Sequence, residues 1–231
     1  MLGGAVIGAA AGATVGFGLT AVIGVGYSST FVSIAGYTAF ATSAISSLTT
    51  AASLISDFDN GMRIFAGRFY IDENRGFWGG MLQSLSHATW EGFQNWIGYN
   101  LGHFRNMAGD VDRVDYFGGA TFITNENASR QNGVSLGGFI NINIRGEIPS
   151  NVSFEQFVLT TPLYMHEYGH TFQSERYGIS YLFAIGLPSI FSAKSDDHHT
   201  KSYERQANRW AWKYANKHGY MDSWDYPTKP R

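Results

Sequence analysis

The first quarter of the chain carries no charge. Residues 1–56 contain no Asp, Glu, Lys or Arg, although the whole chain of 231 residues holds 16 Lys or Arg and 18 Asp or Glu. Asp57 is the first charged residue. A globular domain normally carries charged residues throughout its sequence, so this asymmetry divides the chain into two parts of different chemistry. We predict an apolar helical segment over residues 1–56 and a globular domain over residues 57–231.

Glycine recurs at every fourth position near the N-terminus, from Gly4 to Gly16. On a helix this spacing places small residues in one slowly rotating stripe, and such stripes allow helices to approach closely in lipid. Residues 2–26 are long enough to cross a hydrocarbon core of about 30 Å, and residues 31–55, rich in Ser and Thr, form a second and weaker candidate. The segment is expected to contact a membrane, with packing against a carrier or chaperone as the alternative. A cleaved signal peptide is not expected, because no Lys or Arg precedes the apolar run.

Composition excludes several classes of protein and site. Aromatic residues make up 16% of the chain, which is enough to build a core and excludes a largely disordered protein. A net charge of −2 gives no reason to expect a nucleic-acid partner. Because the chain has no cysteine, any metal must be held mainly by His, Asp or Glu.

The middle of the chain changes from helical to strand-like character. Residues 57–110 are predicted to form helices and loops. The period of the apolar residues then becomes two, which is typical of half-buried strands. We predict a strand with a bulge or turn within residues 115–124, a loop over residues 125–133, and another strand over residues 134–145. The aromatic side chains expected to anchor the helical region are Phe65, Phe69, Phe77, Trp78, Trp90, Phe93, Trp96 and Tyr99.

One short motif carries recognisable chemistry. Residues 166–170 read His-Glu-Tyr-Gly-His, which is the H-E-x-x-H pattern. Residues four apart project from the same face of a helix, so His166 and His170 can both reach one metal ion. Glu167 lies one step round the helix and can act as a general base toward water. Two neutral imidazoles suit Zn²⁺, which takes three protein ligands and one water in catalytic sites.

Capping residues predict the helix that carries this motif. Thr161 is a plausible N-cap, Pro162 a good first residue, and Gly178 a good stop. The uncharged run that follows, residues 179–193, is interrupted by glycine and proline. We therefore predict helix and loop packed under the site rather than a membrane span.

A third ligand is predicted on a later helix. Thr200 can cap that helix, Gly219 can end it, and apolar residues form a stripe along it. Glu204 lies in its first turn and can ligate zinc. Asn208 lies on the same face, where it can hydrogen-bond the outer nitrogen of a ligating histidine.

The sequence offers other assignments of the site. The extended metzincin pattern requires Gly and His where this chain has Gln173 and Arg176, which excludes that subclass. A glutamate in a first helical turn can also be a solvated residue favoured by the helix dipole, but the upstream H-E-x-x-H motif favours a ligand. Residues that could contact substrate or stabilise an oxyanion are His198, His199, Tyr203, Tyr177 and Tyr214.

The motifs resemble two known groups of proteins. H-E-x-x-H followed by Glu-x-x-x-Asn resembles the gluzincin metallopeptidases, whose second motif usually ends in Asp. The segments MHEYGHTFQS (165–174), GLPS (186–189) and ERQANR (204–209) resemble C-terminal domains of bacterial polymorphic toxins, which often follow rearrangement-hotspot (Rhs) repeats. This resemblance covers residues 95–217.

The resemblance implies a fold, a cofactor and partners. It implies an α+β, zincin-like fold with a small mixed or antiparallel sheet, a Zn²⁺ cofactor, and hydrolysis of a peptide or protein substrate. It also implies an effector secreted into a rival cell and neutralised by a cognate immunity protein. In related peptidases an edge strand beside the zinc helix holds the substrate backbone, and residues 134–145 are expected to do so here. The alternative is a membrane-active, pore-forming toxin in which residues 1–56 cause the damage and the zinc site is structural.

Overall fold

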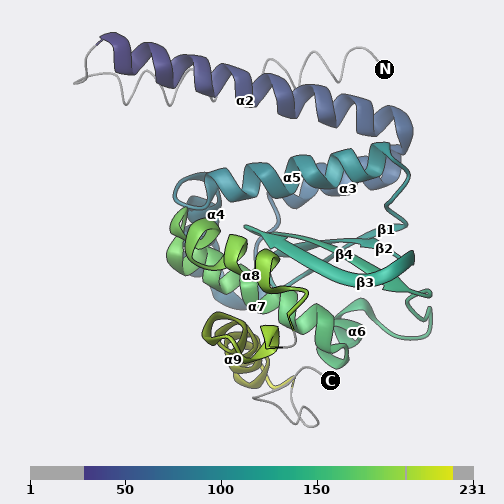
Figure 1. Cartoon of the computed structure of the whole chain (residues 1–231). Helices are drawn as coiled ribbons and strands as arrows, with labels where there is room; N and C mark the ends of the chain where they lie inside the picture. Colours follow the sequence, from purple (N-terminus) through teal and green to yellow (C-terminus); the bar gives the residue numbers. More distant parts are fainter. Residues whose placement is uncertain (1–28, 196, 221–231) are drawn as a thin grey trace.

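A computed structural model describes residues 29–195 and 197–220 (Figure 1). This part of the chain forms an α+β fold in which eight α-helices surround a four-stranded mixed sheet, so the predicted α+β class with a small mixed sheet is confirmed. The helices are α2 (Ser29–Ser56), α3 (Phe58–Gly67), α4 (Gly76–Ala88), α5 (Gly92–Met107), α6 (Phe154–Thr160), α7 (Pro162–Tyr177), α8 (Leu187–Ser192) and α9 (Ser202–Lys217). Short 3₁₀ turns cover Glu73–Arg75 and His198–Thr200, and a π-helical turn covers Leu182–Gly186.

The sheet has the order β1-β2-β4-β3, with β1 (Arg113–Phe117), β2 (Ala120–Asn125), β3 (Asn127–Leu136) and β4 (Phe139–Arg145). β2 and β4 are parallel, and the two outer pairs are antiparallel. The predicted turn within residues 115–124 is confirmed between β1 and β2.

The prediction of one strand over residues 134–145 is wrong. Gly137 has a φ of 65°, in the left-handed region that favours glycine, and a hairpin turn there separates β3 from β4. Apolar residues occupy alternate positions on both sides of this turn, so the pattern does not mark the boundary between β3 and β4. Residues 125–133 were predicted to be a loop, but most of them belong to β3. β3 is polar because it is an outer strand, mostly exposed along this stretch.

The elements stack in layers (Figure 1). α3 and α5 cover one face of the sheet, and α7 covers the other, with α9 packed on the outer side of α7. The larger apolar core lies between the sheet, α7 and α9 and includes Phe122, Ile140, Tyr164 and Tyr168. A smaller core lies between the sheet and the layer of α3 and α5.

Hydrogen bonds made by polar side chains hold the second half of α2 against α5. Thr49 Oγ1 donates to Asn100 Oδ1 at 2.6 Å, and Trp96 Nε1 donates to the carbonyl oxygen of Thr42 at 3.1 Å. The Ser and Thr residues of the weaker candidate span therefore make contacts within the fold. No helix in the described residues is long and apolar enough to cross a membrane. The first candidate span, residues 2–26, lies outside the described residues, and the domain boundary at residue 56 stays a prediction.

Several apolar side chains expected inside the fold lie on its surface. Tyr99 is buried as predicted, but other members of the proposed aromatic anchors are exposed: Phe69, Phe77, Trp78, Trp90 and Phe93. In residues 179–193 the predicted helix is present, and the predicted packing holds for only part of the segment. Tyr181 and Ile185 are buried, whereas five large apolar residues are exposed: Ile179, Phe183, Leu187, Ile190 and Phe191. Their helical spacing did not reveal which face meets the domain.

Candidate metal centre

The crossing of α7 and α9 brings the two sequence motifs together. α7 begins at Pro162 and ends before Gly178, as the capping residues predicted. Gly169, inside the H-E-x-x-H motif, lies against Ala207 of α9, and a Cβ atom at position 169 would be only 2.1 Å from the Ala207 carbonyl oxygen. Glycine at this position therefore permits the close approach of the two helices.

α9 begins later than expected. Its N-cap position is Lys201, so the prediction of Thr200 as the cap is wrong. The Thr200 hydroxyl donates instead to the carbonyl oxygen of Asp197 at 2.7 Å, within the preceding turn. A threonine hydroxyl can either cap a helix or donate to a nearby carbonyl oxygen in a turn, and the sequence does not show which of the two it does.

Three buried side-chain atoms converge where the helices cross. His166 Nε2 lies 3.0 Å from Glu204 Oε2, His170 Nε2 lies 3.2 Å from the same oxygen, and the two imidazole nitrogens are 3.2 Å apart. Zinc–ligand bonds of about 2.0–2.1 Å in a tetrahedron place the ligand atoms about 3.3–3.4 Å from one another. The triangle formed by His166, His170 and Glu204 is therefore close to the size that this coordination requires.

The outer nitrogen of each histidine faces an amide oxygen. His166 Nδ1 donates to Asn208 Oδ1 at 2.8 Å, the contact anticipated for Asn208, and His170 Nδ1 donates to Gln173 Oε1 at 2.7 Å. The Gln173 amide nitrogen donates to the Tyr203 carbonyl oxygen at 2.7 Å, which fixes the orientation of the amide. With Nδ1 protonated in both rings, both Nε2 atoms turn toward Glu204, and a proton or a metal cation must lie between these acceptors.

Burial and charge oppose one another at this cluster. Burial lowers the pKa of His166, but Glu204 and Glu167 raise it, and the net effect is a pKa above 6.5. Burial raises the pKa of Glu204, but hydrogen bonds from His166 and His170 lower it well below its usual range. Glu204 Oε1 is buried and makes no hydrogen bond. A buried, unpartnered carboxylate oxygen is costly without a cation nearby, so the donor set fits a metal ion.

His198 approaches the same carboxylate from the other side. His198 Nδ1 lies 3.7 Å from Glu204 Oε1, and ligand atoms of His166, His198 and Glu204 all lie within 4.8 Å of one another. This buried group could hold a metal ion. The grouping with His170 is tighter and closer to the distances of a coordination tetrahedron, so it is the better candidate for a set of metal ligands.

Glu167 is held against β3. The Ser135 hydroxyl lies 2.7 Å from Glu167 Oε2 and 2.8 Å from the Glu167 carbonyl oxygen, and can donate to either. A Cβ atom at Gly133 would lie 2.5 Å from the Glu167 side chain, so this glycine makes room for the carboxylate. Neither Ser135 nor Gly133 was foreseen, because both are more than 30 positions away in the sequence. Gln173, by contrast, could have been found from its spacing of three from His170 on one helix.

The remaining candidates divide into residues near the centre and residues far from it. Tyr203 OH lies 3.1 Å from Ser192 Oγ, which also contacts His198. Tyr177 instead bonds Gln206 and stacks on Trp210. Tyr214 donates to the buried Asp72, in the apolar core, and His199 is exposed. Tyr181 was not anticipated: its hydroxyl donates to the Ser135 carbonyl oxygen at 3.1 Å and its ring lies 6.3 Å from that of His170.

The expected edge strand is half right. Residues 134–136 belong to β3, which is an outer strand and packs beside α7. Residues 139–145 form β4, which lies inside the sheet between β2 and β3. The outer strand beside the metal centre is therefore β3, over Asn127–Leu136.

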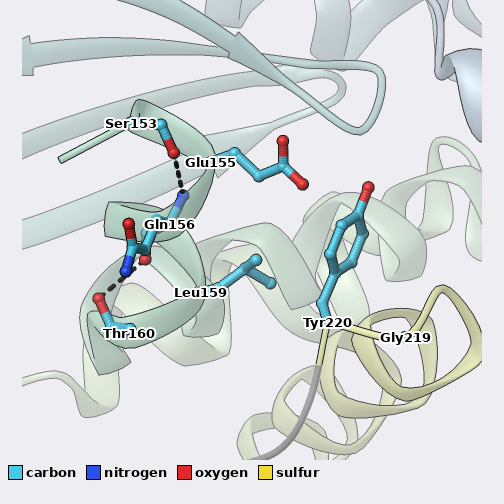
Figure 2. A pocket seen from close by; sticks show the side chains of 7 residues that line it. All are labelled: Ser153, Glu155, Gln156, Leu159, Thr160, Gly219 and Tyr220. Atoms are coloured by element: carbon cyan, nitrogen blue, oxygen red, sulfur yellow. Dashed lines mark hydrogen bonds between the residues drawn. The ribbon is translucent and has the colours of Figure 1, made fainter.

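A separate pocket of about 330 Å³ lies between α6 and the end of α9 (Figure 2). Glu155 and Tyr220 extend along its wall, and Ser153 caps the start of α6 by accepting from the Gln156 amide at 3.2 Å. No residue of the metal centre lines this pocket.

No protein-family model, curated protein or solved structure matches this chain. The functional interpretation therefore depends on the geometry of the centre and on the residues that carry the resemblance.

Proposed function

We propose that this protein is a zinc-dependent hydrolase of the metallopeptidase type. His166, His170 and Glu204 would hold Zn²⁺, and Glu167 would be the general base. The observation that carries the proposal is the convergence of three buried acceptor atoms within 3.2 Å of one another. The orientation of both imidazoles by Asn208 and Gln173 supports it further.

The residues around the centre have distinct parts in this chemistry. Zn²⁺, when bound, supplies a Lewis acid that polarises a carbonyl group and lowers the pKa of water. Glu167 accepts a proton from the attacking water and later delivers it to the leaving amine nitrogen. The Ser135 hydroxyl holds the Glu167 carboxylate against β3 at 2.7 Å. This contact keeps the base from rotating into solvent.

The substrate we propose is an extended peptide that pairs with β3. An outer strand offers unpaired main-chain N–H and C=O groups, and an extended peptide can add to it as a further strand. β3 reaches Glu167 through Gly133 and Ser135. A peptide bound along this strand would thus have its backbone beside the proposed base.

The biological role we propose follows the resemblance to polymorphic toxin domains. The protein would be an effector delivered into a rival cell, where hydrolysis of host proteins is toxic, and an immunity protein would protect the producer. Toxicity on expression in the bacterial cytoplasm, relieved by co-expression of the cognate immunity protein, is the expected result.

Replacement of Glu167 by Gln tests the catalytic claim. The variant keeps the shape of the side chain but cannot accept a proton, so it should retain stoichiometric zinc and lose toxicity and the formation of new protein N-termini in the host proteome. Glu147→Gln, a change at an exposed carboxylate, is the matched control and should behave as the wild type. Full toxicity of Glu167→Gln would overturn the catalytic claim, and a folded wild-type protein without zinc at neutral pH would overturn the metal site.

The charge-free N-terminal segment supports a second candidate, a membrane-active toxin with a structural zinc site. Removal of residues 1–28 is a better test than removal of residues 1–56, because the second half of α2 contacts α5. Toxicity that survives the shorter truncation supports the hydrolase. Loss of toxicity with zinc still bound supports membrane damage.

A further inference from the structure

A third histidine lies beside the proposed metal centre, in addition to the two of the H-E-x-x-H motif. The three histidines meet the Glu204 carboxylate on both of its oxygens: His166 and His170 approach Oε2, at 3.0 and 3.2 Å, and His198 approaches Oε1, at 3.7 Å. Glu204 Oε1 is buried and has no hydrogen-bond partner. The His198 side chain is only 12% exposed, so its imidazole faces the centre rather than solvent.

Two helices hold His198 in this position. His198 Nδ1 lies 2.8 Å from the hydroxyl of Ser192, the last residue of α8, and that hydroxyl lies 3.1 Å from the hydroxyl of Tyr203 in the first turn of α9. His199, its neighbour in sequence, is exposed and contacts only the His198 ring among the interactions described for it. The chain therefore positions one histidine of the pair toward the metal centre and the other toward solvent.

We propose that His198 is a fourth side-chain ligand of the metal, which water and substrate must displace. This inference rests on the proposed function. Ligand atoms of His166, His198 and Glu204 already lie within 4.8 Å of one another, and a side-chain shift of about 1.5 Å brings such distances to those of a zinc shell. Four side-chain ligands make a closed centre, whereas a hydrolase needs one position for water. The protein would therefore have a latent form, closed by His198, and an active form in which His198 has left.

This assignment differs from a role in binding substrate. A histidine that only contacts substrate has no reason to lie against a metal-ligating carboxylate before substrate binds. A fourth metal ligand has such a reason. It places the cation and the His198 imidazole beside Glu204 Oε1, which lowers the free-energy cost of burying that oxygen without a hydrogen bond.

Replacement of zinc by Co²⁺ in the full-length protein tests the assignment directly. In the proton NMR spectrum, each histidine bound to Co²⁺ gives one strongly shifted, solvent-exchangeable ring N–H signal. Three such signals are expected for the wild type and for the control His199→Ala, and two for His198→Ala. A parallel titration against a chelator should show zinc affinity at least about 100-fold lower in His198→Ala, more than the loss of an outer hydrogen bond causes, and unchanged in His199→Ala.

The outcomes separate this inference from the proposed function. Two signals in the wild-type spectrum, with one Co²⁺ bound per chain, would overturn the assignment of His198 and leave the zinc hydrolase standing. This result needs no variant, so misfolding of His198→Ala cannot obscure it. Failure of the wild type to bind Zn²⁺ or Co²⁺ at all would overturn the proposed function itself, and the inference with it.

Discussion

Gly169→Ala tests whether the crossing of α7 and α9 creates the metal centre. An added Cβ would lie 2.1 Å from the Ala207 carbonyl oxygen, and real Cβ atoms essentially never approach within 3.0 Å of such an atom. The two helices must therefore separate by about 1 Å at this point, as steric exclusion requires. Because His166 and His170 lie on α7 and Glu204 on α9, the separation pulls the ligand set apart.

The expected size of the effect follows from these distances. A metal site tolerates ligand distances within about 0.2 Å of their preferred values, so a separation of about 1 Å removes Glu204 from the shell. We expect zinc affinity to fall by at least about 100-fold, more than the loss of an outer hydrogen bond would cause. Overpacking costs about 1–3 kcal/mol, while Ala gains nearly 1 kcal/mol over Gly in a helix. The free energy of unfolding without metal should thus fall by up to about 2 kcal/mol.

Zinc content, chelator competition and urea unfolding of the metal-free protein measure these quantities. Gly92→Ala is the matched control, because it also lies in a helix and its nearest neighbouring atom would be 3.7 Å from the added Cβ. The control should bind zinc as the wild type does and should be no less stable. If Gly169→Ala bound zinc within about threefold of the wild-type affinity, a range well below the effect of one lost ligand contact, the crossing would not determine the site.

Two further variants test the surroundings of the centre and of the fold. Gln173→Ala removes the acceptor of His170 Nδ1, so zinc affinity measured by chelator competition should fall about 10–100-fold. The control Gln156→Ala, on α6, should leave zinc affinity unchanged. Equal affinities of Gln173→Ala and the wild type would refute the positioning role of Gln173. Burial raises the pKa of Glu91 from 4.5 to about 7, so the folded state binds more protons and stability falls as pH rises from 4.5 to 7. Glu91→Gln keeps an acceptor for the Ser86 hydroxyl but does not titrate. The free energy of unfolding of this variant minus that of the wild type should therefore be larger at pH 8 than at pH 4, by up to about 3 kcal/mol, measured by urea unfolding. Burial lowers the pKa of His87 to about 4, so His87 makes stability rise with pH, but it is present in both proteins. If the difference in free energy of unfolding between the variant and the wild type did not change with pH, the reasoning would be contradicted.

Local signals in the sequence were sufficient for the helices that carry the centre. α7 follows from Pro162 at its start, Gly178 at its end, and the spacing of the two histidines between them. α9 follows from its apolar stripe, although it begins at Ser202, one position later than Thr200 as N-cap indicated. Helical hydrogen bonds and caps involve residues within one turn, so they can be read without knowledge of the rest of the fold.

The strands were harder to assign because their pairing is not local. Residues 127–133 are mostly polar and exposed. Their place in the sheet comes from pairing with β4 at Asn127, Asn132 and Gly133, with an irregularity in the register between Asn127 and Asn132. The turn at Gly137 is short, and apolar residues occupy alternate positions both before it (Val134, Leu136) and after it (Ile140, Ile142). The alternation of residues between the two faces of a strand depends only on neighbouring residues. The position of a strand at the edge depends on the order of all the strands in the sheet.

By itself the sequence determined the chemistry available to this protein: a charge-free N-terminal segment, two helices with metal-binding spacing, and His, Glu and Asn side chains on the right faces. Only the tertiary structure decided how these side chains meet. It placed Glu204 within 3.2 Å of both histidines, put Ser135 on Glu167, and turned His198 inward. Those contacts depend on the close crossing at Gly169 and on the position of β3, and both arise from packing between segments far apart in the chain.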